Sequence, residues 1–166
     1  MTGAVYADND SNAFFGGEIF FAHNKADVGG AIYISGSSVV LRGKTIFANN
    51  TADLGGAIYL TDSSELNVTE QGNASFFNNH AGTSGGAVRV NDHSVFNSYG
   101  IASFVFNEAE FGGAINLDSS KLNVIGNVSF EGNHADATGG AVYADNDSNA
   151  FFGGEIFFAH NKADVG

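Results

Sequence analysis

The sequence predicts an all-β fold: a single-stranded parallel β-helix, or β-solenoid, of about six coils. Three observations favour it. The 166 residues include 23 Gly and no Pro, and 16 Phe with no Trp, which is the bias of a repeat rather than of a globular average. The triplet GGA recurs about every 27 residues, and the short stretches between its copies, such as AIYI and ELNV, alternate in the manner of strands. A repeat of this length closes on itself as one coil, whose strands pair with their equivalents in the next coil.

The five copies of GGA set the coil boundaries. Residues 1–166 form one continuous solenoid, and its coils are residues 2–28, 29–54, 55–84, 85–111, 112–138 and 139–165. Polar corners and glycines every six to ten residues leave room for about three short strands per coil. Paired Gly suits a tight corner, where φ is positive or a Cβ would clash. A phosphate-binding loop is excluded, because no GK[ST] and no helical pattern follow these glycines.

Four positions carry the same residue in all six coils, and we call each such set of equivalent residues a column. Each coil contains the motif F-x-x-N-x-A, with a Gly four residues before the Phe. We expect the aromatic residues to stack along the interior and to carry most of the core energy; they are Phe21, Phe47, Phe76, Phe104, Phe130 and Phe158. We expect the amides to form a ladder in which each donates to the next coil; they are Asn24, Asn50, Asn79, Asn107, Asn133 and Asn161.

The pair of motifs GGA[ILV] and FxxN resembles the repeat of the Chlamydia polymorphic membrane proteins. Here it is spelled GGAI at Gly29, Gly55 and Gly112, and GGAV at Gly85 and Gly139. The resemblance covers essentially the whole chain. It implies a right-handed β-helix displayed outside the cell, as in the autotransporter passengers of that family, which act as adhesins. The chain differs from that family in having no Cys.

A longer repeat contains the shorter one. Residues 3–29 reappear unchanged as residues 140–166, an offset of 137 residues that equals the summed length of five coils. We interpret the sequence as an excerpt from a tandem array with no capping element at either end, which continues as a filament. The filament is then either one very long polypeptide or a head-to-tail association of units, so its expected partner is itself. An engineered duplicate is the alternative explanation.

Charge restricts the other partners. The formal net charge is −12, and the six Lys and Arg residues are not clustered, so we expect neither nucleic acid nor an anionic membrane surface as a partner. The absence of Cys rules out disulfides and thiolate metal sites.

Six Asn-x-Ser/Thr sequons are candidate sites for N-linked glycans. On a strand, the acceptor Asn faces outward only when the middle residue of the sequon faces inward. We expect the middle residues Asn50, Val68, Ala74 and Val128 to face inward, and the other two sequons lie in a polar DND corner. The candidates are Asn9, Asn49, Asn67, Asn73, Asn127 and Asn146. The alternative is that they are merely outward-facing polar residues.

We expect no catalytic activity, no metal and no cofactor. A polysaccharide-cleaving β-helix needs an acid set beside a basic residue, whereas the bases lie at unrelated places in the coil. The cluster Asp8-Asn9-Asp10 is interpreted as a solvated corner rather than a weak calcium site. The histidines do not recur at one equivalent position in adjacent coils, so we expect them to be surface imidazoles rather than a stacked set of metal ligands.

The sequence therefore favours a structural unit of an extracellular or cell-surface fibre, glycosylated on its outer face. An adhesin-like surface binding module is the alternative, and a polysaccharide-acting enzyme comes third. The only insertion, about three residues near Thr69–Gln71, is small for a binding loop.

Overall fold

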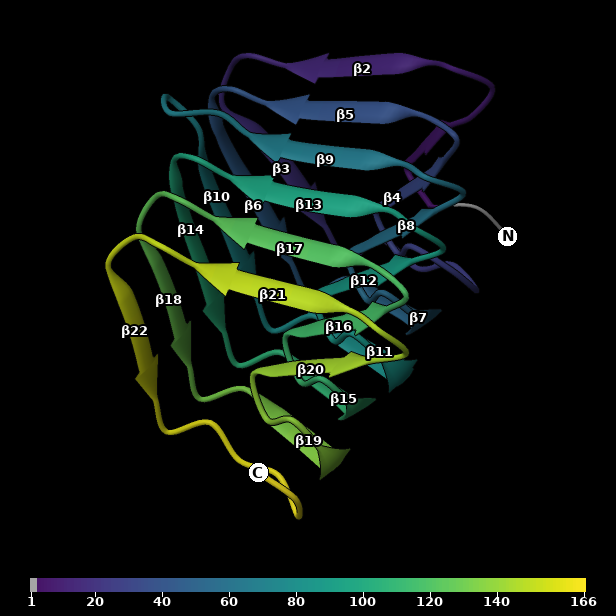
Figure 1. The fold of residues 1–166 in the computed structure, drawn as a ribbon. Coiled ribbons are helices and arrows are strands. Elements are labelled where there is room, and N and C mark those ends of the chain that lie inside the picture. The colour runs from purple at the N-terminus through teal and green to yellow at the C-terminus, as the bar shows by residue number, and fades with distance from the viewer. Residues whose placement is uncertain (1–2) are drawn as a thin grey trace.

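The computed structural model describes residues 3–166, and these form a parallel β-solenoid, which confirms the predicted fold class (Figure 1). Met1 and Thr2, the start of the first predicted coil, lie outside the described residues. Every strand pairing is parallel, and each joins a strand to its equivalent one coil away. Viewed from the N-terminal end, the chain turns clockwise as it recedes, so the helix is right-handed (Figure 1).

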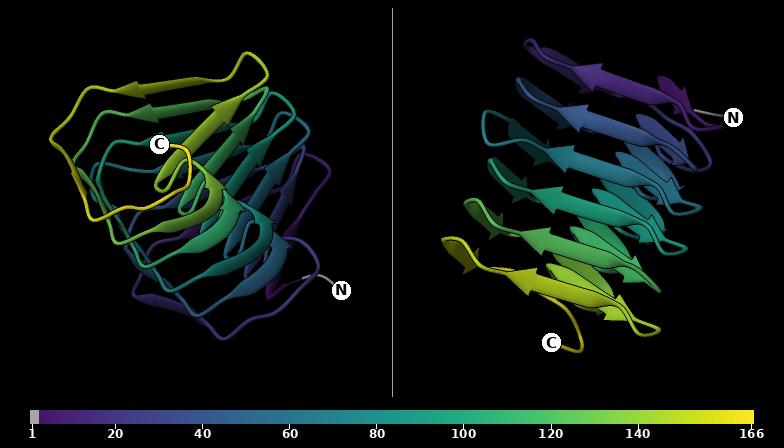
Figure 2. Two further views of the ribbon diagram at one scale, coloured as in Figure 1. Left: turned by 90° about the horizontal axis from the view of Figure 1, so that it is seen from below. Right: turned by 45° about the horizontal axis from the view of Figure 1, so that its top comes forward.

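Three six-stranded sheets run the whole length of the solenoid (Figure 2). The first contains β1 (Val5–Ala7), β4 (Ile32–Ser35), β8 (Ile58–Thr61), β12 (Val88–Asn91), β16 (Ile115–Asp118) and β20 (Val142–Asp145). The second contains β2 (Asn12–Phe15), β5 (Ser38–Leu41), β9 (Glu65–Val68), β13 (Val95–Ser98), β17 (Lys121–Val124) and β21 (Asn149–Phe152). The third contains β3 (Ile19–Ala22), β6 (Lys44–Ala48), β10 (Asn73–Phe77), β14 (Ile101–Val105), β18 (Val128–Glu131) and β22 (Ile156–Ala159).

A fourth, shorter sheet follows the Asn corner of the four middle coils. It contains β7 (Thr51–Leu54), β11 (His80–Ser84), β15 (Glu108–Phe111) and β19 (His134–Thr138). Its register is interrupted, because β11 and β19 carry an extra residue relative to their neighbours. Isolated bridges, such as Lys25 to Thr51 and Thr138 to Val165, extend the same pairing into the two end coils. This side of the coil therefore tolerates irregularity that the other three sides do not show.

Left-handed backbone at recurring corners turns the chain from sheet to sheet. The first Gly of each GGA triplet has φ between +56° and +69°. The residue before each ladder Asn also has a positive φ in all six coils; these residues are His23, Asn49, Asn78, Phe106, Gly132 and His160. Gly, Asn and His tolerate this region, whereas Phe106 is a bulky exception. The corners therefore recur in register and keep the coils stackable.

The core fills the interior with residues that alternate with outward-facing ones along each strand. Ile32, Ile58, Val88 and Ile115 succeed one another in the first sheet and are fully buried. The strands are thus half-buried, and their period of two matches the alternation in the sequence. Among residues 3–166, no helix is long and apolar enough to cross a membrane.

Candidate functional site

The six Phe side chains of the F-x-x-N motif form one continuous stack. Neighbouring ring centroids lie 4.6–5.0 Å apart, and the ring planes differ by 1–10°. Phe47, Phe76, Phe104 and Phe130 are at most 1% exposed. The spacing matches the distance between hydrogen-bonded strands, so one ring per coil fills the interior without a gap.

The six Asn side chains form a ladder at the next corner. Each Nδ2 donates to the Oδ1 of the following Asn at 2.8–3.0 Å, from Asn24 to Asn161. The same Oδ1 atom also accepts a hydrogen bond from the backbone N–H of the preceding Asn, at 3.0 Å. From Asn50 onward, Nδ2 makes a second bond, to the carbonyl of the Phe in the preceding coil. The four middle amides are fully buried and fully satisfied, which is the condition under which a buried polar network stabilises a fold.

A second ladder, of serines, was not predicted from the sequence. At the corner between the first and second sheets, the backbone N–H of one Ser donates to the hydroxyl of the Ser in the next coil. The pairs run from Ser11 to Ser37, Ser37 to Ser64, Ser64 to Ser94, and Ser120 to Ser148, at 3.0–3.3 Å. The sequence does contain a pattern from which this ladder could have been predicted, because all six coils have Ser at this corner.

The second Gly of each GGA triplet is required by the close approach of neighbouring coils. A Cβ on Gly86 would overlap the backbone oxygen of Gly113, and it would lie 2.6 Å from the backbone oxygen of Glu108. Gly30 and Gly56 meet the equivalent oxygen of the following coil in the same way. This column therefore sets the distance between coils along one edge of the solenoid.

We predict that Gly86→Ala lowers the free energy of unfolding by about 1–3 kcal/mol, because backbone atoms of two coils must move apart. Gly82→Ala is the matched control, since its added Cβ would first meet the Asp53 carboxylate at 3.3 Å. Urea titration followed by circular dichroism measures both. Similar losses for the two variants would show that the spacing is not set by this column.

The six sequon asparagines lie on the outer surface or at corners, and their exposure differs. The middle residues Asn50, Val68, Ala74 and Val128 are all buried. Asn73, the first residue of β10, and Asn127, the residue before β18, are exposed, and so are Asn9 and Asn146 in the DND corners. Asn49 and Asn67 are half-buried, and their Oδ1 atoms accept hydrogen bonds from Asn78 at 2.7 Å and Asn97 at 2.9 Å. Asn146 Nδ2 donates to Asp118 at 2.8 Å. Asn73 and Asn127 are the two exposed sequon residues outside the left-handed corners, since Asn9 and Asn146 have φ of +55° and +50°.

Three of the basic side chains make local polar contacts. Lys44 Nζ lies 2.7 Å from Glu18, Arg89 Nη2 lies 2.8 Å from Asp118, and Arg42 Nε donates to Gln71 at 2.8 Å. The imidazole of His134 lies 3.1 Å from Asp136. Within residues 3–166, no group of three or more His, Cys, Asp or Glu side chains is placed to hold a metal ion.

Aromatic side chains also lie on the outside of the first coils. Tyr6 and Tyr33 stack with ring centroids 5.0 Å apart, and Tyr33 and Tyr59 continue the column at 5.6 Å. Burial within this column raises the pKa of Tyr33 above its ordinary value. Phe14 and Phe20 are 61% and 62% exposed on the second and third sheets. The first coil therefore presents an aromatic residue on each of its three long faces.

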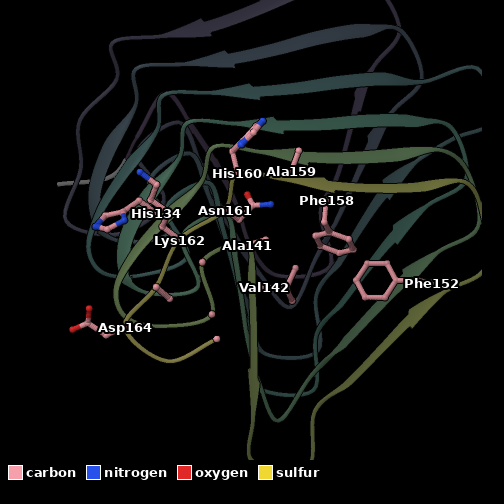
Figure 3. Close-up of a pocket in the computed structure, with 14 residues that line it drawn as sticks. His134, Ala141, Val142, Phe152, Phe158, Ala159, His160, Asn161, Lys162 and Asp164 are labelled. Atoms are coloured by element: carbon pink, nitrogen blue, oxygen red, sulfur yellow. The ribbon is translucent and has the colours of Figure 1, made fainter.

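The two ends of the solenoid differ although their sequences are the same. Phe21, in the first coil, is 7% exposed, whereas its copy Phe158, in the last coil, is 51% exposed. Phe21 stacks on Phe47 of the following coil, whereas Phe158 stacks on Phe130 of the preceding coil, so the exposed side of Phe158 is the one that faces away from the other coils. A hollow of about 900 Å³ lies there. Phe158 and Phe152 lie close together at one side of it with Val142 nearby, and His134, Lys162 and Asp164 lie at the opposite side (Figure 3).

Comparisons with known proteins agree with the geometry. The Chlamydia polymorphic membrane protein repeat matches residues 44–61 and 127–145. Both segments run from the stacked Phe and ladder Asn through the GGA triplet into the next coil. No curated protein and no solved structure matches the chain. Two segments of the chain are thus similar to this repeat, and the structure places both on a parallel β-solenoid.

Proposed function

We propose, from the polymorphic-membrane-protein-type repeats, that this chain is a structural segment of an extracellular or cell-surface fibre. The fibre is a tandem β-solenoid in which 137-residue units follow one another without interruption. One observation carries the proposal: residues 3–29 and 140–166 are identical and occupy equivalent coils, with every strand in the same sheet. A translation by five coils therefore superposes the sequence on itself.

The structure has room for such a continuation. Residues 3–28 pair with coil 29–54 through all three long sheets, with Val5 opposite Ile32, Phe15 opposite Leu41 and Phe21 opposite Phe47. Coil 139–165 has the same side chains at these places, so a following coil with the sequence of residues 29–54, of which Gly166 is the first residue, would pair in the same register. A seamless junction between units needs no new contact.

Charge suits a soluble fibre. Residues 29–165 contain 14 Asp and Glu and 5 Lys and Arg, a net charge of −9 per unit. Repulsion between such surfaces discourages the sideways pairing of exposed β-structure. The exposed sequons at Asn73 and Asn127 would add sugars to the same surface.

Imaging and mass measurement of the protein from its natural source test the fibre. We expect unbranched rods of uniform width, and a chain much longer than one unit. A monodisperse chain of 17.2 kDa in compact particles would count against the proposal.

Glycan attachment is tested separately by mass spectrometry of the natural protein before and after glycosidase treatment. We expect mass loss that maps to Asn73 and Asn127, and none at Asn123, a half-buried Asn outside any sequon. Asn73→Gln and Asn127→Gln will each remove one glycan from a glycosylating expression host. An unchanged mass in all samples would contradict glycosylation of this surface but would not affect the proposal that the chain forms a fibre.

A surface binding module is the second candidate, and one observation favours it. The exposed rings of Tyr6, Phe14 and Phe20 lie on the three faces of a single coil. The 137-residue repeat places their copies Tyr143, Phe151 and Phe157 in coil 139–165, where the two Phe rings are exposed and Tyr143 is half-buried. Regularly spaced aromatic residues would give a multivalent adhesive surface. Adhesion of beads coated with the protein to host cells tests this role. Replacing Phe20 and Phe157 by Ser should then lower adhesion, whereas replacing the half-buried serines of the same face, Ser103 and Ser129, by Ala should not.

A further inference from the structure

We propose that the corner between β9 and β10 forms a binding site for a neutral sugar, a hexopyranose unit of a glycan, beside the exposed ring of Phe14. A hollow of about 370 Å³ lies here on the side of the solenoid, lined by Phe14, Arg42, Thr69, Glu70 and Gln71. This volume is within the range of about 300–1,000 Å³ that is typical of small-ligand sites. The inference does not depend on the proposed fibre.

The chain departs from the regular coil at this corner. Two residues connect β5 to β6, whereas four, residues 69–72, connect β9 to β10, and Figure 1 shows this loop extending to the level of the preceding coil. The backbone N–H of Gly72 donates to the carbonyl of Thr69 at 2.8 Å, which closes a turn and leaves Glu70 and Gln71 exposed at its tip. The turn is short, so the site also needs side chains of the two preceding coils.

The first of these side chains is Phe14, which is 61% exposed. A Cβ added to Gly16 would lie 2.7 Å from Phe14 Cε1, so the ring lies over this glycine, and its copy Phe151 lies over Gly153 at the same 2.7 Å. Phe14 has its neighbouring coil on one side, through β5, and Phe151 has its neighbour on the other side, through β17. The coil itself therefore sets the position of the ring, whichever neighbour is present.

Arg42 lies between the Phe14 coil and the turn. Its backbone N–H donates to the carbonyl of Phe15 at 2.9 Å, and that of Thr69 donates to the carbonyl of Leu41 at 3.1 Å, so the corners of three successive coils stack. Arg42 Nε donates to Gln71 Oε1 at 2.8 Å, which holds the guanidinium against the turn. Within residues 3–166, its two Nη groups have no hydrogen-bond or ion-pair partner, and neither has the buried hydroxyl of Thr69. The hollow thus has unused polar groups in its wall.

These groups match the chemistry of a pyranose, which has a face of C–H groups and a rim of hydroxyls. The C–H groups pack on the negative face of an aromatic ring, here that of Phe14. Planar guanidinium and amide groups, here those of Arg42 and Gln71, form hydrogen bonds with neighbouring hydroxyls. The carboxylate of Glu70 opposes an anionic ligand and the guanidinium opposes a cationic one, so the site favours a neutral sugar.

The test uses residues 1–166 made in a host that adds no glycans, so that sugars on the chain itself do not occupy the site. The probes are the methyl glycosides of glucose, galactose, mannose and N-acetylglucosamine, followed by saturation-transfer NMR and titration. We expect at least one to bind, with the strongest transfer to the C–H protons of one ring face and equal affinity at low and high salt. No binding of any probe would overturn the proposal, and so would a preference for methyl glucuronide that disappears in high salt.

A glycosylated sample distinguishes the source of the sugar, because Asn73 directly follows the turn and begins β10. We expect the glycosylated protein to bind the same probe equally well, as it will when the site takes glycans of other molecules. Binding that is lost on glycosylation and restored by Asn73→Gln would confirm the sugar site and assign it to the chain's own glycan.

Matched variants locate the site. We expect Phe14→Ala to weaken binding by about tenfold or more, and Phe151→Ala to leave it unchanged, because Arg42 and Gln71 lie beside Phe14 and not beside Phe151. Arg42→Lys keeps the charge but loses the planar fork, so we expect binding to weaken by about fivefold. The replaced side chains are exposed, so the unfolding midpoints should not change. Equal losses in the two Phe variants, or full affinity in Arg42→Lys, would contradict this site and leave the fibre proposal standing.

Discussion

Asn107→Ala is expected to lower the free energy of unfolding by about 3–5 kcal/mol. Asn107 is fully buried and makes four side-chain hydrogen bonds, two given by Nδ2 and two accepted by Oδ1. Alanine leaves the backbone N–H of Asn79 and the carbonyl of Phe76 without these partners inside the solenoid. Each buried group left unsatisfied costs about 1–3 kcal/mol, and the cavity adds to the loss. Urea titration of the two proteins measures the difference.

Asn123→Ala is the matched control for the ladder. Asn123 lies half-buried on the outer face of the second sheet, where its Nδ2 donates to Asn97 at 2.9 Å. Water can replace that bond, so the loss should stay below about 1 kcal/mol. Equal losses at Asn107 and Asn123 would mean that the buried ladder contributes no more than any surface amide.

Phe104→Ala is expected to cost about 3–5 kcal/mol. The ring is 1% exposed and stacks on Phe76 at 4.6 Å and on Phe130 at 4.9 Å, with the edge of Phe96 at 6.4 Å. Alanine removes the buried aromatic area, opens a cavity in the middle of the stack and breaks two ring contacts. The neighbouring coils cannot collapse into the gap, because the pairing of β14 with β10 and β18 fixes their backbone spacing.

The control for the Phe stack is Phe157→Ala, on the exposed side of the third sheet. Phe157 is 57% exposed, so its truncation should change the free energy of unfolding by less than about 1 kcal/mol. Thermal or urea unfolding, followed in parallel for both variants, gives the comparison. If Phe157→Ala proved as costly as Phe104→Ala, stability would not come from the interior stack.

The regular part of the fold could be predicted because each coil repeats the same physical requirement. Every coil needs an inward-facing Phe at one position and, at another, an Asn whose side chain bonds to the next coil. Because each occurs six times, the sequence alone reveals the pattern. Phe106 shows the limit of such reasoning. It lies two residues after Phe104, where strand alternation would turn it inward, yet it sits at a corner with φ +54° and is 55% exposed. The corner conformation decides its direction.

The fourth sheet and the asymmetry of the ends were not predicted. Strand β11 reads HAGTS and has little of the alternation or β-branched content that identifies a strand, so its pairing is imposed by the coils on either side. The ends carry the same 27-residue sequence, and only the structure shows that Phe21 is covered while Phe158 is open. That difference depends on which side of a coil faces a neighbour, which no local pattern records.

The length added by each 137-residue unit tests the central claim most directly. Chains that consist of residues 1–166 followed by zero, one or two further copies of residues 30–166 can be compared by small-angle X-ray scattering. A seamless solenoid gains five coils per unit at about 4.8 Å each, so we predict about 24 Å of added length with an unchanged cross-section. An increment of about 35 Å or more, as expected for separate globular units joined in a row, would contradict the account.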